Sequence, residues 1–555
     1  MTIFLCILAA IGLFAGTVLA SGEFVKRSPL RLNWGLHGLS LLLILVALVT
    51  RGIWYDAHTY FGDLWTVFDS LWKTAQGLRS SLDYFSPIGP VMQWLFALTL
   101  IVRPPSASSI VLANGLVAIV SLVLAVVLLR RRASPVTIAL TGLIAVATAL
   151  TSRDIDSIVP AAQSDFLAPY NRWGWALLVP VAMRAALPLA RPDVAGAILS
   201  GAAIALLILL KITYGVAALG VYALATVVQP RRWREGLIVG ASLVACLLIA
   251  DIVTGGQVRA YLADLRMTAQ MPFNGVRLGK LISELPNFTL FALGSLLLLL
   301  GAARDSATGP VKLLLLNWRP IVLAFATGGA GLVVLMQNHY ATDTTTLVLM
   351  PLIIAEWTGL FAAPRTESQA VWTKRADLIG LILLIALSGP AMDAGFIIAQ
   401  KFQLARKSRL PGLAGSAFHD LVIENTHLPT AEGACGDSTC VDYRRMVSGR
   451  ALLEQACPDR KNLAILALNF SNPFPAFVGA KSPTGAPTWL HFNRSFSAQV
   501  HPTAKVMLGD VGCILEAKEG DGISVALMNI YGPDIQKAFL PKAQNAEWQL
   551  WTRQD

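Results

Sequence analysis

The chain has 555 residues, of which 55% are hydrophobic and only 14% are charged, and its mean hydropathy is +0.61. Soluble globular domains carry about 25% charged residues, so this composition excludes an ordinary soluble enzyme and indicates a polytopic membrane protein. The formal net charge of +11 does not indicate nucleic-acid binding, because the basic residues form short clusters at the ends of apolar segments, where they act as topology signals.

Apolar segments long enough to cross a bilayer recur through residues 1–400, which we assign as a transmembrane domain. A spanning helix needs about 20 apolar residues, and about twelve segments qualify. They begin near residues 2, 37, 107, 135, 173, 194, 212, 236, 286, 320, 345 and 377. The first has no basic residues before it, so we expect a retained helix with its N-terminus outside rather than a cleaved signal peptide, with a signal anchor as the alternative.

Basic clusters between these segments set the expected topology, because cytoplasmic loops carry an excess of Lys and Arg. The clusters are Lys26 and Arg27, Arg130 to Arg132, and Arg231 to Arg234. Placing them in the cytoplasm puts the outer loops at residues 53–106, 152–172, 255–285 and 337–344. The apolar run from Val91 to Val102 then becomes an interfacial helix on the outer surface, with a re-entrant or spanning helix as the alternative.

The first outer loop contains the segment richest in acidic and aromatic residues, from Ile53 to Pro90. Its aspartates are Asp56, Asp63, Asp69 and Asp83. A carboxylate beside hydrocarbon costs free energy unless it has a partner or a task, and partial desolvation suits a carboxylate to general base catalysis. The alternative is a set of solvated acids beside an aromatic belt. We treat this segment as a candidate active site.

The same loop resembles a known enzyme family. Gly77, the stretch DYFSPIGP, the apolar run after it and a span ending in three arginines resemble the N-terminal region of GT-C glycosyltransferases, which use polyprenyl-phosphate-linked sugars. The resemblance implies that Asp63, or Asp69 as second candidate, activates or orients an acceptor hydroxyl in an inverting single displacement. Asp56 and Asp83 are assigned to substrate binding. The adjacent acidic pair typical of the family is missing from this loop.

A lipid phosphate in a low-dielectric site needs cations to balance its charge. Three basic residues lie at predicted outer helix ends. Arg172 lies in the motif APYNRWGW, Lys211 interrupts a long apolar run in LLKITYG, and Arg51 ends the helix before the acidic loop. We assign these three residues to the donor phosphate. The alternative for each is snorkelling of its side chain to the interface.

Other outer-loop residues are candidates for substrate binding. Tyr170 precedes the arginine of APYNRWGW, and the motif QNHYATDTT places His339 and Tyr340 at another outer rim, where a neutral imidazole can hydrogen-bond a sugar or a phosphate. Asp154 and Asp156 form a DxD string of the kind that holds a divalent metal with a nucleotide sugar. Nucleotide sugars are cytoplasmic, whereas this loop is predicted outside, so we assign no metal ligand and no cofactor, with a divalent metal as the alternative.

Long apolar runs stop after Lys401, and residues 401–555 have the composition of a separate soluble domain. Short alternating runs and intervening helical stretches predict an α/β or α+β fold. Its cysteines are Cys435, Cys440, Cys457 and Cys513. An even number of cysteines in an outside compartment suggests two disulfides, and proximity favours pairing of the first two. A zinc site is the rival, but neither the spacing nor a histidine pair supports it.

The sequence thus predicts a GT-C-like bundle of about twelve transmembrane helices with a soluble domain in the periplasm of a bacterial inner membrane. Its expected activity is transfer of a sugar from a polyprenyl phosphate to a cell-envelope glycan or lipid. One alternative is an O-antigen ligase or glycan polymerase, which places its functional residues in a late outer loop. Another is a transporter or flippase, which would show matching broken helices in two halves. The chain contains no Walker, HExxH or GxSxG motif.

Overall fold

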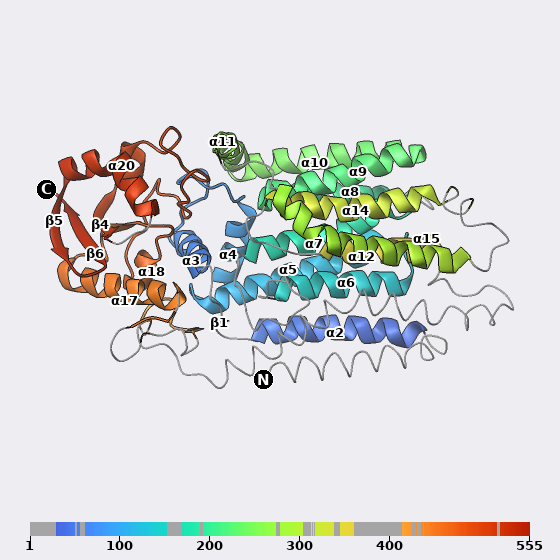
Figure 1. Cartoon of the computed structure of the whole chain (residues 1–555), viewed down its shortest axis with the longest axis horizontal. Helices are drawn as coiled ribbons and strands as arrows, with labels where there is room; N and C mark the ends of the chain where they lie inside the picture. Colours follow the sequence, from blue (N-terminus) through green and yellow to red (C-terminus); the bar gives the residue numbers. More distant parts are fainter. Residues whose placement is uncertain are drawn as a thin grey trace.

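The computed structural model describes most of the chain. The described ranges are 29–49, 53–55, 61–151, 169–188, 192–272, 278–303, 317–337, 345–359, 415–423, 434–436, 438–518 and 522–554, with a few single residues between them. A long bundle of helices carries a mixed α/β domain at one end (Figure 1). The predicted fold class, a helical membrane protein with a C-terminal α/β domain, is confirmed.

Ten predicted spans fall on helices that lie side by side along the long axis of the molecule (Figure 1). They are α2 (Pro29–Val49), α5 (Ala107–Leu129), α6 (Pro135–Leu150), α7 (Pro169–Ala186), α8 (Val194–Leu210), α9 (Ile212–Val228), α10 (Trp233–Val253), α12 (Leu278–Ala303), α14 (Trp318–Gln337) and α15 (Thr345–Trp357). Within the described ranges, three helical stretches are long and apolar enough to cross a membrane: Ala107–Leu129, Pro230–Val253 and Trp318–Met336. The predicted spans near residues 2 and 377 lie outside the described residues.

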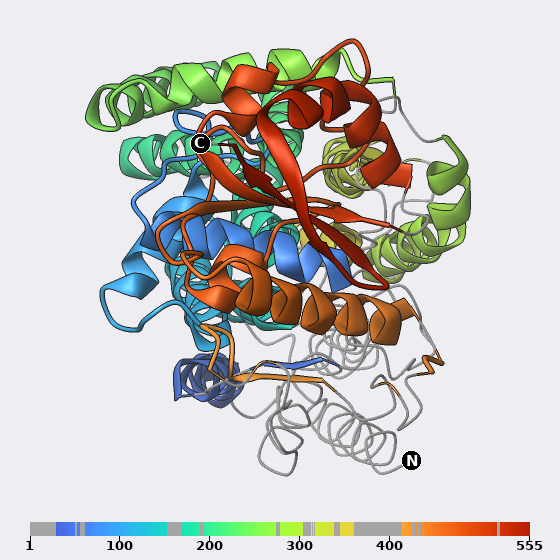
Figure 2. The same cartoon turned by 90° about the vertical axis from the view of Figure 1, so that its left-hand side faces the viewer.

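The α/β domain is built on a four-stranded sheet in the order β3-β4-β6-β5, with β3 and β4 parallel and the other pairs antiparallel. Its elements are α17 (Ser438–Ala456), β3 (Ala464–Leu468), α18 (Phe474–Val478), α19 (Ala504–Leu508), β4 (Val511–Ala517), α20 (Gly522–Ala538), β5 (Phe539–Gln544) and β6 (Trp548–Arg553). Strand residues alternate between faces. Ile465 packs in the core that includes α17 and Leu466 in the core that includes α20, so the sheet lies between these two helices (Figure 2).

Cysteine pairing ties the α/β domain together. The four cysteines form the disulfides Cys435–Cys440 and Cys457–Cys513. The first joins the segment before α17 to the first turn of that helix, and the second joins the residue after α17 to β4. Such links are expected in an oxidising compartment.

Several short elements lie where the bundle meets the α/β domain (Figure 1). They are β1 (Ile53–Tyr55), α3 (Phe61–Ala75), α4 (Val91–Leu100) and α11 (Gln257–Ala269). β1 pairs in parallel with β2 (Leu421–Ile423), so the first outer loop and the start of the α/β domain share a small sheet. With 10 residues, α4 is too short to cross a bilayer. We call this region the outer end.

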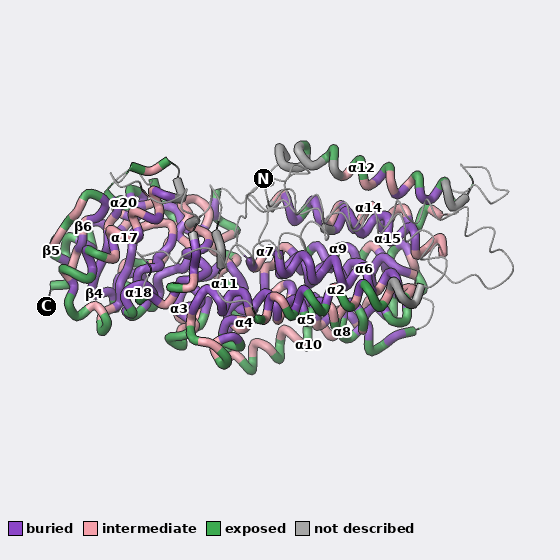
Figure 3. Tube along the Cα trace, turned by 90° about the horizontal axis from the view of Figure 1, so that it is seen from below, coloured by how far each residue is buried: buried purple, intermediate pink, exposed green. Residues whose placement is uncertain are grey.

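Burial differs between the helices of the bundle (Figure 3). α6 and α7 are buried on nearly all sides, whereas only Glu235, Val239 and Leu243 of α10 are buried. The exposed side chains of α10 are large and apolar, including Leu237, Leu248 and Ile252. An exposed apolar face of this extent fits a helix that faces lipid.

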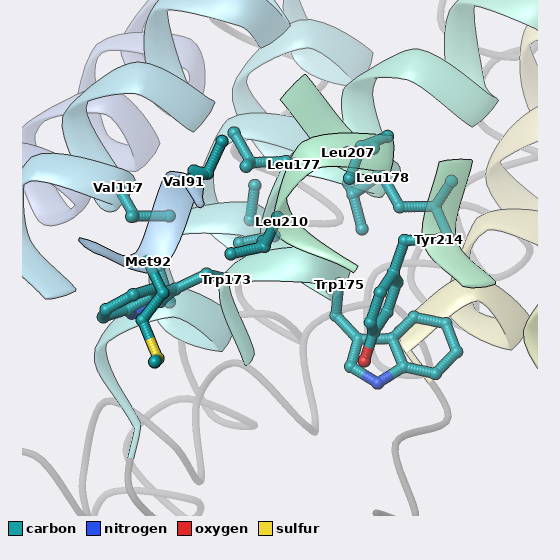
Figure 4. Close-up of a cluster of buried hydrophobic side chains, with 14 of the residues drawn as sticks. Val91, Met92, Val117, Trp173, Trp175, Leu177, Leu178, Leu207, Leu210 and Tyr214 are labelled. Atoms are coloured by element: carbon teal, nitrogen blue, oxygen red, sulfur yellow. The ribbon is translucent and has the colours of Figure 1, made fainter. Parts of the chain in front are cut away.

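Aromatic side chains of α7 fill the bundle near the outer end. Trp173 lies beside Met92 and Trp175 beside Tyr214 in the close-up (Figure 4). The rings of Trp175 and Tyr214 meet edge to face with their centroids 5.4 Å apart. The buried indole N–H of Trp173 donates to Asn114 Oδ1 at 2.8 Å, which satisfies a polar group that burial would otherwise penalise. This packing fixes the start of α7.

A buried ion network joins the helices at the opposite end of the bundle, which we call the inner end. Glu235 Oε1 accepts from Arg132 Nη2 at 2.5 Å and from Arg184 Nη2 at 3.2 Å, and Glu235 Oε2 accepts from Arg232 Nε at 3.1 Å. Arg184 Nη1 also pairs with Asp193 Oδ2 at 3.0 Å. The Arg130 to Arg132 cluster and the Arg231 to Arg234 cluster therefore lie at the same end, away from the α/β domain.

Candidate functional site at the outer end

The amphipathic helix α3 packs its apolar face against the α/β domain. Leu64, Trp65 and Phe68 are buried. Trp65 meets Phe477 edge to face at 5.1 Å, and Phe68 stacks on Phe418 with centroids 3.8 Å apart. This packing leaves Asp63, in the first turn of α3, at the partly exposed edge of the helix.

Hydrogen bonds fasten the C-terminal half of α3 and the following loop to the α/β domain. The side chains of Trp72 and Gln76 both donate to the carbonyl oxygen of Ala480, at 3.0 Å and 2.7 Å. Gln76 Oε1 accepts from the backbone N–H of Ser482 at 2.7 Å. The backbone N–H of Gly485 donates to Asp83 O at 2.7 Å. We call these four contacts the α3 clamp.

Asp69 lies on the buried side of α3, away from the edge that carries Asp63. Its carboxylate accepts a hydrogen bond from Lys73 Nζ at 2.8 Å, and both side chains are 0% exposed. The ammonium group of Lys73 also lies 5.1 Å from the centre of the Tyr84 ring. Burial raises the pKa of Asp69, while the positive charge of Lys73 acts in the opposite direction. The geometry therefore favours a structural role for Asp69 and leaves Asp63 as the first candidate.

The DYFSPIGP stretch brings the first outer loop against the end of α8. The backbone N–H of Gly89 donates to Leu210 O at 3.1 Å. A Cβ atom at Gly89 would overlap the carbonyl oxygen of Leu209, so this approach requires glycine. On the other side, the backbone N–H of Ser86 donates to Asp264 Oδ2 of α11 at 3.0 Å. The stretch therefore holds the loop that follows α3 against the C-terminal end of α8, next to Lys211.

Lys211 lies between the last residue of α8 and the first of α9, in an extended conformation outside both helices. Its ammonium group donates to Asn171 Oδ1 at 2.8 Å and lies 5.3 Å from the centre of the Tyr170 ring. Burial lowers the pKa of Lys211 to about 7. The positive charge of Arg494 acts in the same direction, and the negative charge of Asp63 acts in the opposite direction. These three charged groups are close enough to influence one another.

The first turn of α7 contributes further polar residues. Pro169 begins the helix, and Tyr170, Asn171 and Arg172 follow it. Proline suits this position because the first N–H groups of a helix have no intrahelical acceptor. Asn171 and Arg172 are both buried. The first turn of α7 therefore contains Tyr170, predicted to bind substrate, and Arg172, predicted to bind the donor phosphate. Asn171, which accepts the hydrogen bond from Lys211, lies between them.

Arg494 was not predicted from the sequence. It follows Asn493, whose φ of 62° is left-handed, in a tight turn where the Arg494 N–H donates to His491 O at 3.0 Å. Its guanidinium group lies 5.4 Å from the centre of the Trp489 ring. The aromatic surroundings in TWLHFNRSF match those of Arg172 in APYNRWGW, which is the one signal that could have drawn attention to it.

The structure brings only some of the predicted residues together. Asp63, Tyr170 and Lys211 lie near one another, with Arg172 in the same turn as Tyr170. Asp83 lies elsewhere, where its carboxylate accepts from the Arg79 backbone N–H at 2.7 Å. Four candidates, Arg51, Asp56, His339 and Tyr340, lie outside the described residues.

A cavity of about 400 Å³ adjoins Asp63 on the side of the α/β domain. Its lining comes from α3, α17, the segment after β3 and the start of α20: Gly62, Asp63, Trp65, Asp442, Arg445, Met446, Asn469, Phe470, Ser471 and Ile523. The described residues contain no group of three or more His, Cys, Asp or Glu side chains that could hold a metal ion. Asp63 therefore lies between a cationic region and this cavity.

No protein-family model and no curated protein sequence matches the chain. Among solved structures, it is similar to ArnT from Cupriavidus metallidurans bound to undecaprenyl phosphate, with a TM-score of 0.46 and 12% identity over 93% of this chain and 97% of that chain. For ArnT of the same organism in the apo state, the TM-score is 0.44 and the identity 12%, over 93% of this chain and 96% of that chain. Likeness at this level assigns no activity and no site residue to this chain.

Proposed function

We propose that this protein is a membrane glycosyltransferase that moves a sugar from a polyprenyl phosphate to an acceptor hydroxyl at the outer end. The observation that carries the proposal is that Asp63 and the half-buried Lys211, from separate parts of the chain, lie close enough for their charges to interact, with Lys211 held beside Asn171 and Tyr170. A glycosyl transfer from a lipid phosphate needs a base for the acceptor and a cation for the leaving group. The outer end offers both.

The cationic part of the site suits the donor. Lys211, Arg172 and Arg494 supply positive charge where the apolar bundle meets the α/β domain, so a phosphate could bind there with its lipid along the bundle. Charge-assisted hydrogen bonds to phosphate oxygens are among the strongest in proteins. These cations would also stabilise the negative charge that develops on the phosphate as it leaves.

Asp63 is placed to serve the acceptor. In the proposed step the acceptor oxygen attacks the anomeric carbon and forms the new C–O bond, while the bond from that carbon to the phosphate oxygen breaks. The acceptor proton passes to the Asp63 carboxylate, and the electron pair of the broken bond leaves with the polyprenyl phosphate. Attack opposite the leaving group inverts the anomeric centre. No metal ion or further reactant is needed to balance this step.

The decisive assay uses the purified full-length protein, a panel of polyprenyl-phosphate sugars and cell-envelope glycans or lipids as acceptors. We expect Asp63→Asn to lower turnover by about 10²- to 10⁴-fold, the range for loss of a general base. Asp69→Asn should lower stability because it disrupts a buried ion pair, yet folded enzyme should keep turnover within about tenfold of the parent. Asp459→Asn is the surface control. Full turnover by the Asp63 variant would disprove the assigned role.

We also propose that the outer end faces the periplasm of a bacterial inner membrane, because lipid-linked sugar donors are used there. The inner-end clusters support this orientation through the excess of basic residues in cytoplasmic loops. Single cysteines at positions 63 and 131 test it with a membrane-impermeant thiol reagent in a chain lacking Cys6 and Cys246. Labelling from outside should reach position 63 and not 131, whereas the reverse pattern would overturn the orientation.

A further inference from the structure

The cavity beside Asp63 has a lining that resembles neither a lipid pocket nor a phosphate site. Five of its ten lining residues have charged, amide or hydroxyl side chains: Asp63, Asp442, Arg445, Asn469 and Ser471. The rest include the faces of Trp65 and Phe470. Carboxylates and amides accept or donate hydrogen bonds to hydroxyl groups, and aromatic faces cover the apolar C–H surface of a sugar ring. The volume of about 400 Å³ lies within the range of small-molecule sites.

The charged groups of this lining differ from those of the donor region, which are all basic. Two carboxylates, Asp63 and Asp442, face the cavity with one arginine. That arginine, Arg445, is already paired with Glu547 at 3.4 Å, and Arg444 pairs with the same carboxylate at 2.8 Å. The lining therefore carries charges of both signs, and a neutral group with hydroxyls can bind there without bringing a charge of its own that needs a partner.

Asp63 belongs to both regions. It influences Lys211 on the side of the bundle and lines the cavity on the side of the α/β domain. A ligand in the cavity could place a hydroxyl group against the Asp63 carboxylate without entering the cationic region. The cavity also contains residues of α17 and α20, so part of its shape is set by the α/β domain.

We propose that this cavity is the acceptor site and that the acceptor group it binds is a neutral saccharide. The inference rests on the proposed function. It adds the class of acceptor and states that the acceptor reaches Asp63 from the side of the α/β domain. Asp442 and Asn469 orient the saccharide through its hydroxyl groups. Ile523 borders the cavity from α20 and limits the size of the sugar.

The test compares acceptors and variants in the full-length protein. Neutral mono- and oligosaccharides are compared with their phosphorylated or carboxylated counterparts as acceptors. Asp442→Ala removes a hydrogen-bond acceptor for hydroxyl groups, and Ile523→Trp fills the cavity without changing its charge. Matched controls are Glu454→Ala, on the same helix as Asp442 and paired with Arg450 on the surface, and Val525→Trp, an exposed position near Ile523 on α20. Binding of undecaprenyl phosphate is measured on every variant.

We expect neutral saccharides to be the better acceptors. Asp442→Ala and Ile523→Trp should raise the acceptor KM at least about tenfold, while the Kd for undecaprenyl phosphate and the values for both controls change less than about twofold. Preference for anionic acceptors, or an unchanged KM in both cavity variants while transfer continues, would overturn the acceptor site and leave the proposed function standing. Failure of the parent protein to bind undecaprenyl phosphate and to transfer any sugar would instead overturn the proposed function.

Discussion

The two ends of the bundle use buried charge in different ways. At the inner end, the guanidinium groups of Arg132, Arg184 and Arg232 all bond directly to Glu235, at distances from 2.5 to 3.2 Å. At the outer end, Lys211 bonds to the neutral amide of Asn171 and lies over an aromatic ring. The inner network compensates positive with negative charge among the helices, whereas at the outer end the positive charge of Arg494 and the negative charge of Asp63 both act on Lys211, whose pKa burial lowers to about 7.

This difference separates charges that hold the fold from charges that are placed for a ligand. A buried ion whose partner is present costs little further free energy, but removal of one partner leaves an uncompensated charge and is strongly destabilising. A lysine whose pKa is lowered toward neutrality has a different property, because an arriving anion stabilises its charged form. Substitutions at the two ends should therefore affect different measurements.

The largest expected effect on stability is at the inner end. Arg184→Met should lower the free energy of unfolding by about 3–5 kcal/mol, because it leaves the carboxylates of Asp193 and Glu235 with fewer partners in a buried site. Denaturant or thermal unfolding of the purified protein in detergent measures this loss. Arg131→Met is the control, since that side chain is 56% exposed and should change stability by less than about 1 kcal/mol. Equal effects of the two variants would contradict the structural role of the network.

The second effect tests the docking of the outer loop. Gly89→Ala should lower stability by about 1–3 kcal/mol and weaken donor binding, because the new methyl group would push the loop away from the end of α8 and from Lys211. Gly240→Ala is the matched control, since a Cβ atom at that helical position meets no other atom within 4 Å. Unfolding midpoints and the Kd for undecaprenyl phosphate are measured for both. A Gly89 variant with parental values would show that the close approach is unimportant.

The third effect is the pH dependence of donor binding. With a pKa of about 7, Lys211 is protonated below neutrality and loses its charge as the pH rises, so the affinity for undecaprenyl phosphate should be higher at pH 6.5 than at 8.5, by about tenfold. Lys211→Arg keeps its charge throughout this range and should show a flatter profile. The phosphate titrates in both proteins, so only the difference between the two profiles reports on Lys211. Identical profiles would contradict direct contact with the phosphate.

The smallest expected effect concerns Asp264 on α11. Burial raises the pKa of Asp264 to about 6, while hydrogen bonds from Ser86 and Ser81 oppose the shift. Because the pKa of Asp264 is higher in the folded protein than in the unfolded chain, this carboxyl group stabilises the fold at low pH, where it is protonated. That stabilisation is lost as the pH rises through about 6. Asp264→Asn keeps an acceptor for Ser86 and should be about 1 kcal/mol more stable than the parent at pH 7, with a weaker dependence on pH between 4 and 7. Unfolding measured across that range checks the prediction.

The arrangement of helices was largely predictable from the sequence. Hydrophobic segments separated by basic clusters gave the positions of the spans, because the bilayer imposes a minimum apolar length and cytoplasmic loops are basic. The change of composition after Lys401 indicated the α/β domain in the same way. Pairing of β1 with β2 was not predictable, since three-residue strands far apart in the chain have no local pattern.

The candidate site was predictable only in part. Asp63 and Lys211 each interrupt or border an apolar segment, which makes them visible in the sequence. Lys73 lies four residues after Asp69, a spacing at which helical side chains pair, and attention to it would have indicated the buried ion pair. Arg494 depends on a turn of the α/β domain and on the packing of that domain against α3, so its place beside Lys211 required the three-dimensional structure.

The α3 clamp has a consequence for engineering. Because Trp72 and Gln76 bond to the α/β domain, the helix that carries Asp63 is positioned by both parts of the protein. A graft that exchanged only the residues after 401 would replace Ala480, whose carbonyl oxygen accepts two of these hydrogen bonds. It would also replace the surface against which α3 packs. In a functional chimera, α3 and the α/β domain should therefore come from the same parent protein.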